Sequence, residues 1–194
     1  MTPIRKDKDA YSNKDKNYPI LGVIDEFPFT IHGKALLKHD VPKIHVRKLV
    51  VEALYTLNGL KEDFSLSVSG RPVSFSGKRG CIVDVGYGTV FMRLNEEIAK
   101  KFTHSSISSQ RFIDFQITIS YHYDRGGKKV PLRSDQLLIR HVFLSKKIVI
   151  MLVHIKGIRR IPLFDILSLV IKKIDQSFQS GGFNGVIIEE LRAL

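Results

Sequence analysis

One short stretch of the chain carries residue types that could handle phosphate or a metal ion. Asp84 stands near the end of an apolar run and is followed by two glycines, in Asp84-Val85-Gly86-Tyr87-Gly88-Thr89. Glycines let backbone N–H groups approach a phosphate, while a carboxylate can hold a metal ion or position a water. A phosphate-handling enzyme that uses Asp84 is therefore one interpretation. The other is a structural strand that bulges at the glycines.

Asp84 and its glycines resemble the first phosphate loop of the actin and sugar-kinase superfamily, and also the Asp-x-Gly loop of aspartic proteases. The actin-like fold needs two large domains, which 194 residues do not supply. A retroviral-type protease has Ser or Thr where this chain has Val85. We therefore expect Asp84 to be structural, and we expect a protein that is not an enzyme and uses no cofactor.

The other reactive side chains do not form a recognisable site in the sequence. Cys81 opens an apolar segment with no base beside it, and neither a Gly-x-Ser-x-Gly elbow nor a Walker A motif occurs. The histidines lack the spacing of a zinc-binding helix or a Cys/His grouping, so we expect no metal site. They are His32, His39, His45, His104, His122, His141 and His154.

Basic residues dominate the charge of the chain. It has 31 Lys+Arg against 19 Asp+Glu, a net charge of +12, and ten basic residues with one acid, Asp135, between positions 125 and 160. Such a balance favours a polyanionic partner: nucleic acid, an acidic membrane leaflet or an acidic protein. The candidate anion-binding residues are Arg125, Lys128, Lys129, Arg133, Lys146, Lys147, Lys156, Arg159 and Arg160. A second basic group consists of Lys34, Lys38, Lys43, Arg47 and Lys48.

Length and composition indicate a charged arm followed by one domain. Residues 1–21 are predicted to be a flexible arm that ends in an apolar plug, Tyr18-Pro19-Ile20-Leu21, and residues 22–194 a single globular domain. The N-terminus lacks the apolar run of a signal peptide, and the apolar run 148–155 is too short to span a membrane.

The spacing of apolar residues predicts an α+β fold. The clearest strand is 113–123, in which apolar and polar residues alternate. A helix capped by Asp40 should run to Leu57 and bury Val50 and Leu54, and Asn95 should cap a short helix to Phe102. Further strands are expected at 27–37, 63–69, 81–94, 136–144 and 147–155, a mobile loop at 103–110, and a last helix at 162–178. We expect an antiparallel sheet of about five to six strands packed against two main helices.

An ordered series of segments in the middle of the chain resembles a rhabdovirus matrix protein. A Phe-x-Phe-Thr strand (Phe27-Pro28-Phe29-Thr30-Ile31) leads through basic residues into an amphipathic helix. Later, Val90-Phe91-Met92 precedes an acidic-then-basic helix at 95–102, which leads to a strand ending in Tyr and Asp at 117–124. The resemblance covers about residues 27–124.

This resemblance implies a viral structural protein that condenses the ribonucleoprotein and bridges it to the inner face of an acidic membrane. Such a protein self-associates by docking a flexible segment on a neighbour, and it helps budding from the host cell. The localisation that the resemblance implies is the virion and, in the host cell, the cytoplasm, the inner face of the membrane and the nucleus. The family's Pro-Pro-x-Tyr budding motif is absent, although Tyr18-Pro19-Ile20-Leu21 fits the Tyr-Pro-x-Leu late motif that host budding machinery reads. An apolar anchor that fastens the arm to the core is the other interpretation of that segment.

The alternative function is a basic RNA- or DNA-binding module, or a silencing module. Phe112, Phe115, Tyr121 and Tyr123 lie near Arg125 and could form a platform on which bases stack. The tyrosines, however, alternate with aliphatic residues of the same strand face. This favours a place in the core over a place on a platform.

Overall fold

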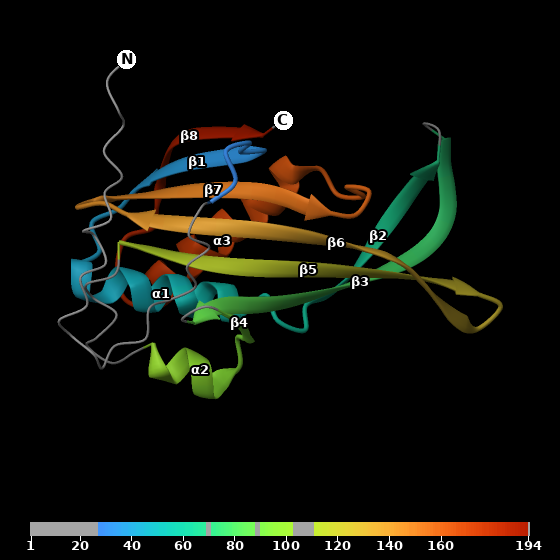
Figure 1. Cartoon of the computed structure of the whole chain (residues 1–194), viewed down its shortest axis with the longest axis horizontal. Coiled ribbons are helices and arrows are strands. Elements are labelled where there is room, and N and C mark those ends of the chain that lie inside the picture. The colour runs from blue at the N-terminus through green and yellow to red at the C-terminus, as the bar shows by residue number, and fades with distance from the viewer. Residues whose placement is uncertain (1–26, 69–70, 88–89, 103–110, 194) are drawn as a thin grey trace, which may run out of the picture.

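The structure, a computed structural model, describes residues 27–68, 71–87, 90–102 and 111–193 (Figure 1). The three helices are α1 (Lys43–Tyr55), α2 (Glu96–Lys101) and α3 (Leu163–Ser180). The strands are β1 (Gly33–Lys38), β2 (Lys61–Val68), β3 (Arg71–Tyr87), β4 (Val90–Arg93), β5 (Phe112–Arg125), β6 (Lys128–Phe143), β7 (Lys147–Lys156) and β8 (Ile187–Ala193). The arm and plug of residues 1–21 and the loop 103–110 lie outside the described residues.

The strands form one antiparallel sheet. Seven of them follow one another in the order β2-β3-β5-β6-β7-β1-β8, and the short β4 pairs with β3 outside this path. The prediction of an α+β fold with an antiparallel sheet is thus confirmed, although five to six strands was too few. The helices α1 and α3 pack against each other over the same face of the sheet, which we call the helix face (Figure 1).

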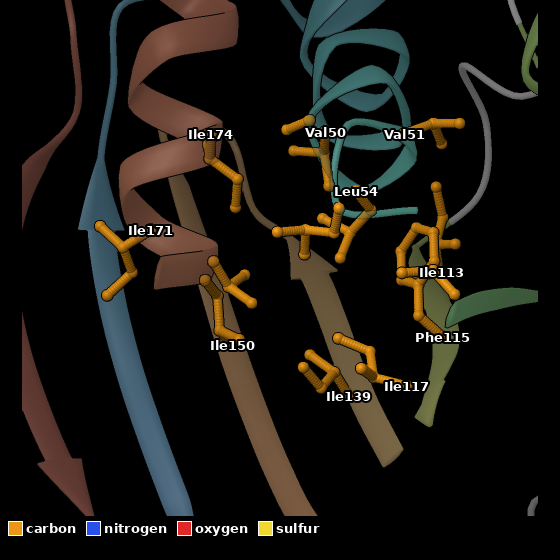
Figure 2. Packing of buried hydrophobic residues seen from close by; sticks show 14 of the residues in the cluster. Val50, Val51, Leu54, Ile113, Phe115, Ile117, Ile139, Ile150, Ile171 and Ile174 are labelled. Carbon is orange, nitrogen blue, oxygen red and sulfur yellow. The ribbon is translucent and has the colours of Figure 1, made fainter. Parts of the chain in front are cut away.

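The core lies between the helix face and the two long helices. Figure 2 shows Val50 and Leu54 of α1 and Ile174 of α3 pointing toward strand residues such as Phe115 and Ile139. The odd positions of β5 from Ile113 to Tyr121 are all buried, as the alternation predicts. The stripe predicted for α1 is buried as well: Val46, Leu49, Val50, Ala53, Leu54 and Leu57.

The helix ends agree with the sequence at two places and differ at one. Asn95 caps α2, since its side-chain oxygen accepts the N–H of Ile98 at 2.8 Å. Pro162 precedes α3, as expected. Asp40 does not cap α1, because Pro42 occupies the cap position and contributes no side-chain hydrogen bond. The Asp40 carboxylate instead accepts a hydrogen bond from the side-chain amide of Asn184.

Several strand boundaries differ from the prediction. The first strand begins at Gly33 rather than Phe27, and Phe29 is 95% exposed. Pro28 lacks the N–H that a sheet ladder needs, which explains the later start. The predicted bulge at Gly86 is wrong: β3 and β4 pair without a register shift from Asp84↔Arg93 to Tyr87↔Val90. The β8 strand was missed.

The β5–β6 hairpin is longer than the sequence indicates. β6 begins at Lys128, eight residues before the expected start at Gln136. Gly126 and Gly127 turn the chain between the strands with positive φ angles of 59° and 78°. Two successive positive φ angles define the turn that matches the twist of an antiparallel hairpin, and glycine adopts them without strain.

The packing of α1 predicts a large effect of truncation at its buried face. Leu54→Ala should lower the free energy of unfolding by about 2–5 kcal/mol, because Leu54 is 0% exposed in the core. The matched control on the same helix is Ile44→Ala, which should change it by less than about 0.5 kcal/mol because Ile44 is 63% exposed. Urea unfolding followed by circular dichroism measures both. Equal losses for the two variants would contradict this helix register.

Candidate functional site

The tip of the β5–β6 hairpin projects beyond the end of β7, while β3 runs beside β5 as far as the pair Gly77↔Tyr123. Pairing of β6 with β7 stops at Gln136↔Lys156, whereas β6 itself begins at Lys128. At about 3.3 Å per residue, these eight residues carry the tip roughly 26 Å past the end of β7 (Figure 1). Arg125, Lys128, Lys129 and Arg133 on this projection are all exposed. The projection therefore places four cations beyond the end of β7.

The segment between β7 and α3 adds three more basic residues near the root of this hairpin. Lys156 and Arg159 are exposed and Arg160 is half-buried. The guanidinium carbon of Arg160 lies 5.7 Å from the centre of the Tyr121 ring, close enough for a cation–π contact. We call these three residues together with Arg125, Lys128, Lys129 and Arg133 the basic end.

Asp135 holds this segment in place. Its carboxylate accepts the backbone N–H groups of Arg159 and Arg160, each at 3.0 Å, and the hydroxyl of Tyr121 at 2.7 Å. The Nε2 atom of His154 lies 3.4 Å from Oδ1 of the same carboxylate. The one acid in the basic stretch is 2% exposed and bound by its own chain, so little of its charge is offered to a ligand.

The electrostatics of Asp135 follow from these contacts. Burial opposes ionisation, but the hydrogen bonds from Tyr121 and from the N–H groups of Arg160 and Arg159 outweigh it and lower the pKa of the carboxyl. Burial, with the bond to Asp135, raises the pKa of the Tyr121 hydroxyl far above its ordinary value. Both groups therefore keep a fixed protonation state around neutral pH: an anionic carboxylate accepts from a neutral phenol.

Gly157 makes the close approach of this segment possible. Its φ of 113° is strained for any residue with a side chain. A Cβ atom there would also collide with the carboxylate of Asp135 and the carbonyl of Ser134. Arg159, with a φ of 50°, adopts a left-handed conformation two residues later.

The nine predicted anion-binding residues do not form one patch. Lys146 and Lys147 lie at the turn between β6 and β7, at the opposite end of a ten-residue strand from Lys156. The ammonium of Lys147 pairs with Glu189 of β8 at 2.7 Å. The other seven residues form the basic end. Sequence proximity was misleading here, because an antiparallel hairpin sends neighbouring stretches to opposite ends of the sheet.

Much of the remaining basic charge is already neutralised or buried. Arg140 forms two hydrogen bonds of 2.7 Å with the fully buried carboxylate of Asp114, and its guanidinium lies against the rings of Phe112 and Phe27. Arg47 of the second basic group is 3% exposed and lies over the Phe143 ring. In the same group, Lys34 pairs with Glu190 at 3.4 Å and Lys48 with Glu52 at 3.7 Å.

The structure contradicts the alternative in which these aromatic residues form a platform for base stacking. Phe115 and Tyr121 are 0% exposed in the core, and the Phe112 ring is covered by the guanidinium of Arg140, 4.0 Å from its centre. Tyr123, the last of the four aromatic residues, is half-buried. The core interpretation of this face, which the alternation favoured, is confirmed.

The geometry around Asp84 supports a structural role. Its carboxylate accepts a hydrogen bond of 2.7 Å from the guanidinium of Arg93, the residue opposite it on β4. Gly88 and Thr89 lie outside the described residues. Within the described ranges, no group of three or more His, Cys, Asp or Glu side chains is placed to hold a metal ion.

Two histidines belong to the core instead of to a site. The His141 ring meets the Phe115 ring edge-on at a centroid distance of 5.4 Å, and burial lowers its pKa to about 3. The His39 ring meets Phe178 at 5.8 Å in the same way. Alternation along β6 with Leu137, Ile139 and Phe143 was the signal that could have placed His141 inside.

Cys81 borders a small apolar cavity. The cavity has a volume of about 80 Å³ and lies between α3 and the neighbouring strands, with Ile117, Ile166 and Leu169 among its walls. An apolar cavity that accepts benzene measures about 150 Å³. This cavity is therefore smaller than one that holds a benzene ring.

Comparison of the chain with protein-family models, with curated proteins and with solved structures finds no match. The resemblance to rhabdovirus matrix proteins stays a prediction from the sequence.

The Asp135 contacts predict a stability effect that depends on pH. Asp135→Asn should lower the free energy of unfolding by about 2–3 kcal/mol at pH 7, because three donors lose a charged acceptor. The pKa of Asp135 is lowered in the folded state, so its stabilisation is present above the unfolded pKa and is lost as pH falls through the folded pKa. The difference between wild type and variant should shrink below about pH 4.

Urea unfolding followed by circular dichroism at pH 7 and at lower pH tests this prediction. Asp165→Asn, at an exposed position in the first turn of α3, is the control and should cost less than about 1 kcal/mol. A cost for Asp135→Asn no larger than that of the control would show that the carboxylate does not hold the segment.

Proposed function

We propose that this protein is a matrix-type structural protein, which self-associates and bridges a ribonucleoprotein to the inner face of an acidic membrane. The observation that carries the proposal is the basic end. It displays the cations of a projecting hairpin and of the segment after β7. The one acid between positions 125 and 160, Asp135, is bound by N–H groups of its own chain. No catalytic role is part of the proposal.

The strength of such a surface suits reversible attachment. A basic residue near an anionic leaflet contributes about 1 kcal/mol, and this attraction falls off within a Debye length of about 10 Å at 0.1 M salt. The hairpin projects further than this past the end of β7, so its tip cations can lie within the range of a charged surface while β7 stays outside it. A few tip cations thus hold one copy weakly, and an assembly of many copies holds firmly through avidity.

The described helices do not provide an alternative anchor. Within the part of the chain that the structure describes, no helix is long and apolar enough to cross a membrane. Attachment in this proposal is therefore electrostatic and should fall with salt concentration.

Bridging requires a second polyanion contact, and the opposite end of the sheet offers a weaker one. Lys38 and Lys146 meet there in an open groove that also contains Asp40 and Asp175. Mixed charge makes this groove a poorer anion site than the basic end. A single copy therefore binds one polyanion well and a second only weakly.

The alternative, a nucleic-acid-binding module, uses the same cations without the membrane. Because Phe115 and Tyr121 are buried and Phe112 is covered by Arg140, RNA would be held through its phosphates rather than its bases. The two functions are therefore separated by whether the basic end also binds acidic lipid.

Charge reversal at the hairpin tip should weaken binding to both polyanions. The variant Arg125→Glu, Lys128→Glu, Lys129→Glu removes about 3 kcal/mol of attraction and adds repulsion, so affinity should fall about 100-fold or more at low salt. Flotation with liposomes that contain phosphatidylserine, and an RNA gel shift at matched salt, measure it. The domain should stay folded because these side chains are exposed.

The matched control reverses three exposed lysines elsewhere, Lys43, Lys101 and Lys172, with the same change in net charge. Its binding should fall much less than that of the tip variant. Loss of RNA binding alone, with no liposome binding in the wild type, would support the nucleic-acid module instead. Equal loss in both variants would show that the tip is not the site.

Removal of residues 1–21 should reduce assembly without removing anion binding. Tyr18, Ile20 and Leu21 would stabilise a contact with a neighbour by about 1.5–3 kcal/mol per large side chain before ordering costs. Contacts that do not close on themselves propagate into lattices. Sedimentation velocity at several concentrations should show growth for the full chain and smaller species for the shortened one. A full chain that stays monomeric at high concentration and low salt would contradict the matrix function.

A further inference from the structure

β8 lies at the edge of the sheet that the described strands form. β8 pairs with β1 on one side, and no described strand pairs with its other side (Figure 1). Its backbone N–H and C=O groups on that side form a template for another strand. Proteins protect such an edge with proline or with charged side chains, lysine above all. Residues 187–193 contain neither proline nor lysine, and their charges, Glu189, Glu190 and Arg192, are of both signs. Ile187 and Ile188 at this edge are 62% and 50% exposed.

The side chains of β8 divide between the two faces of the sheet. Leu191 lies opposite Ala35 of β1 and packs against the core on the helix face. Glu190 and Arg192 lie opposite Leu36 and Lys34, on the other face, and approach each other at 3.2 Å. An acid and a base thus flank Leu191 along the strand, on the face away from the helices.

We propose that β8 pairs with β8 of a second copy of this chain, antiparallel and centred on Leu191. A two-fold axis perpendicular to the sheet places one residue opposite its own copy and pairs the positions around it symmetrically. With Leu191 at the axis, Glu190 lies opposite Arg192 of the partner subunit, and Arg192 opposite Glu190 of the partner subunit. Leu191 meets its own copy on the helix face, next to the core.

Several registers of the β8–β8 pair would keep the two-fold symmetry, and they differ in which residue lies at the axis. The charges of β8 favour the register centred on Leu191. Centring on Glu189, Glu190 or Arg192 places like charges directly opposite each other, which destabilises a strand pair. Centring on Ile188 leaves only about three residues of β8 in the pairing. The register centred on Leu191 gives two opposite-charge pairs, and each contributes about 0.2–1 kcal/mol.

Such a dimer has a consequence for bridging, and this consequence alone rests on the proposed function. A two-fold axis perpendicular to the sheet reverses the strand direction between the copies. The two basic ends then point in opposite directions along the strands. One dimer would present a basic end to each of two polyanions. A single copy has only one basic end, because its opposite end carries mixed charge.

The charge pattern gives the first test on the full chain. Arg192→Glu places glutamates opposite each other and should raise the dimer dissociation constant about tenfold or more in sedimentation velocity. The exchange Glu190→Arg with Arg192→Glu restores the complementarity and should return the constant to within about threefold of wild type. An unchanged constant in Arg192→Glu, or no recovery in the exchanged protein, would overturn the proposal.

A symmetric cross-link gives the second test. In a Cys81→Ser background with unchanged circular dichroism, Leu191→Cys should form an intersubunit disulfide, because directly opposite residues lie about 4.5–5.5 Å apart. Glu190→Cys is the control and should not cross-link, since its two copies would be about 8 Å apart. Cross-linking of Glu190→Cys in preference to Leu191→Cys would exclude this register. The tip variant Arg125→Glu, Lys128→Glu, Lys129→Glu should dimerise normally, so failure of anion binding and failure of the dimer are separable.

Discussion

The carboxylate of Asp135 connects the sheet to the segment that leads into α3. Three donors converge on it from two parts of the chain: the hydroxyl of Tyr121 on β5 and the N–H groups of Arg159 and Arg160. A buried anion of this kind is stable only when its hydrogen bonds are satisfied. Because the segment is fixed there, Lys156 and Arg159 keep a defined position at the root of the projecting hairpin. Removal of the carboxylate would free the cations as well as weaken the fold.

A second buried carboxylate, Asp114, is satisfied on the other face of the sheet, here by an ion pair. Asp114 is 0% exposed, and the guanidinium of Arg140 meets it with two hydrogen bonds while lying against two aromatic rings. Arg140 is therefore part of the architecture and adds nothing to a polyanion surface. In both cases a charged residue is used inside the domain. Arg140 and Asp114 cancel each other, so the number of basic residues, rather than the net charge, overstates the cations that are available for binding.

The sheet has the geometry that the proposed assembly would use. Its strands end in a basic hairpin at one side and in a turn with mixed charge at the other, and the outer side of the edge strand β8 is paired with no described strand. An antiparallel dimer through that edge would combine two molecules, each with one basic end, into one assembly with a basic end on each of two opposite sides. The arm of residues 1–21 would supply a contact of a different kind, and two different contacts are what a lattice needs.

The sequence by itself determined the elements whose signal is local. Alternation along β5, the apolar stripe of α1 and the Asn95 cap each follow from short-range geometry, and each was predicted. The sheet order, the exposure of charges and the position of β8 were not predictable in this way. β8 is short and carries two adjacent glutamates, so its place in the sheet depends on pairing with β1, which is about 150 residues earlier in the chain. The division of the basic residues between two ends, and the use of Asp135 and Arg140 inside the domain, were decided by the tertiary structure alone. The physical reason is that burial and ion pairing depend on neighbours that only the folded chain brings together.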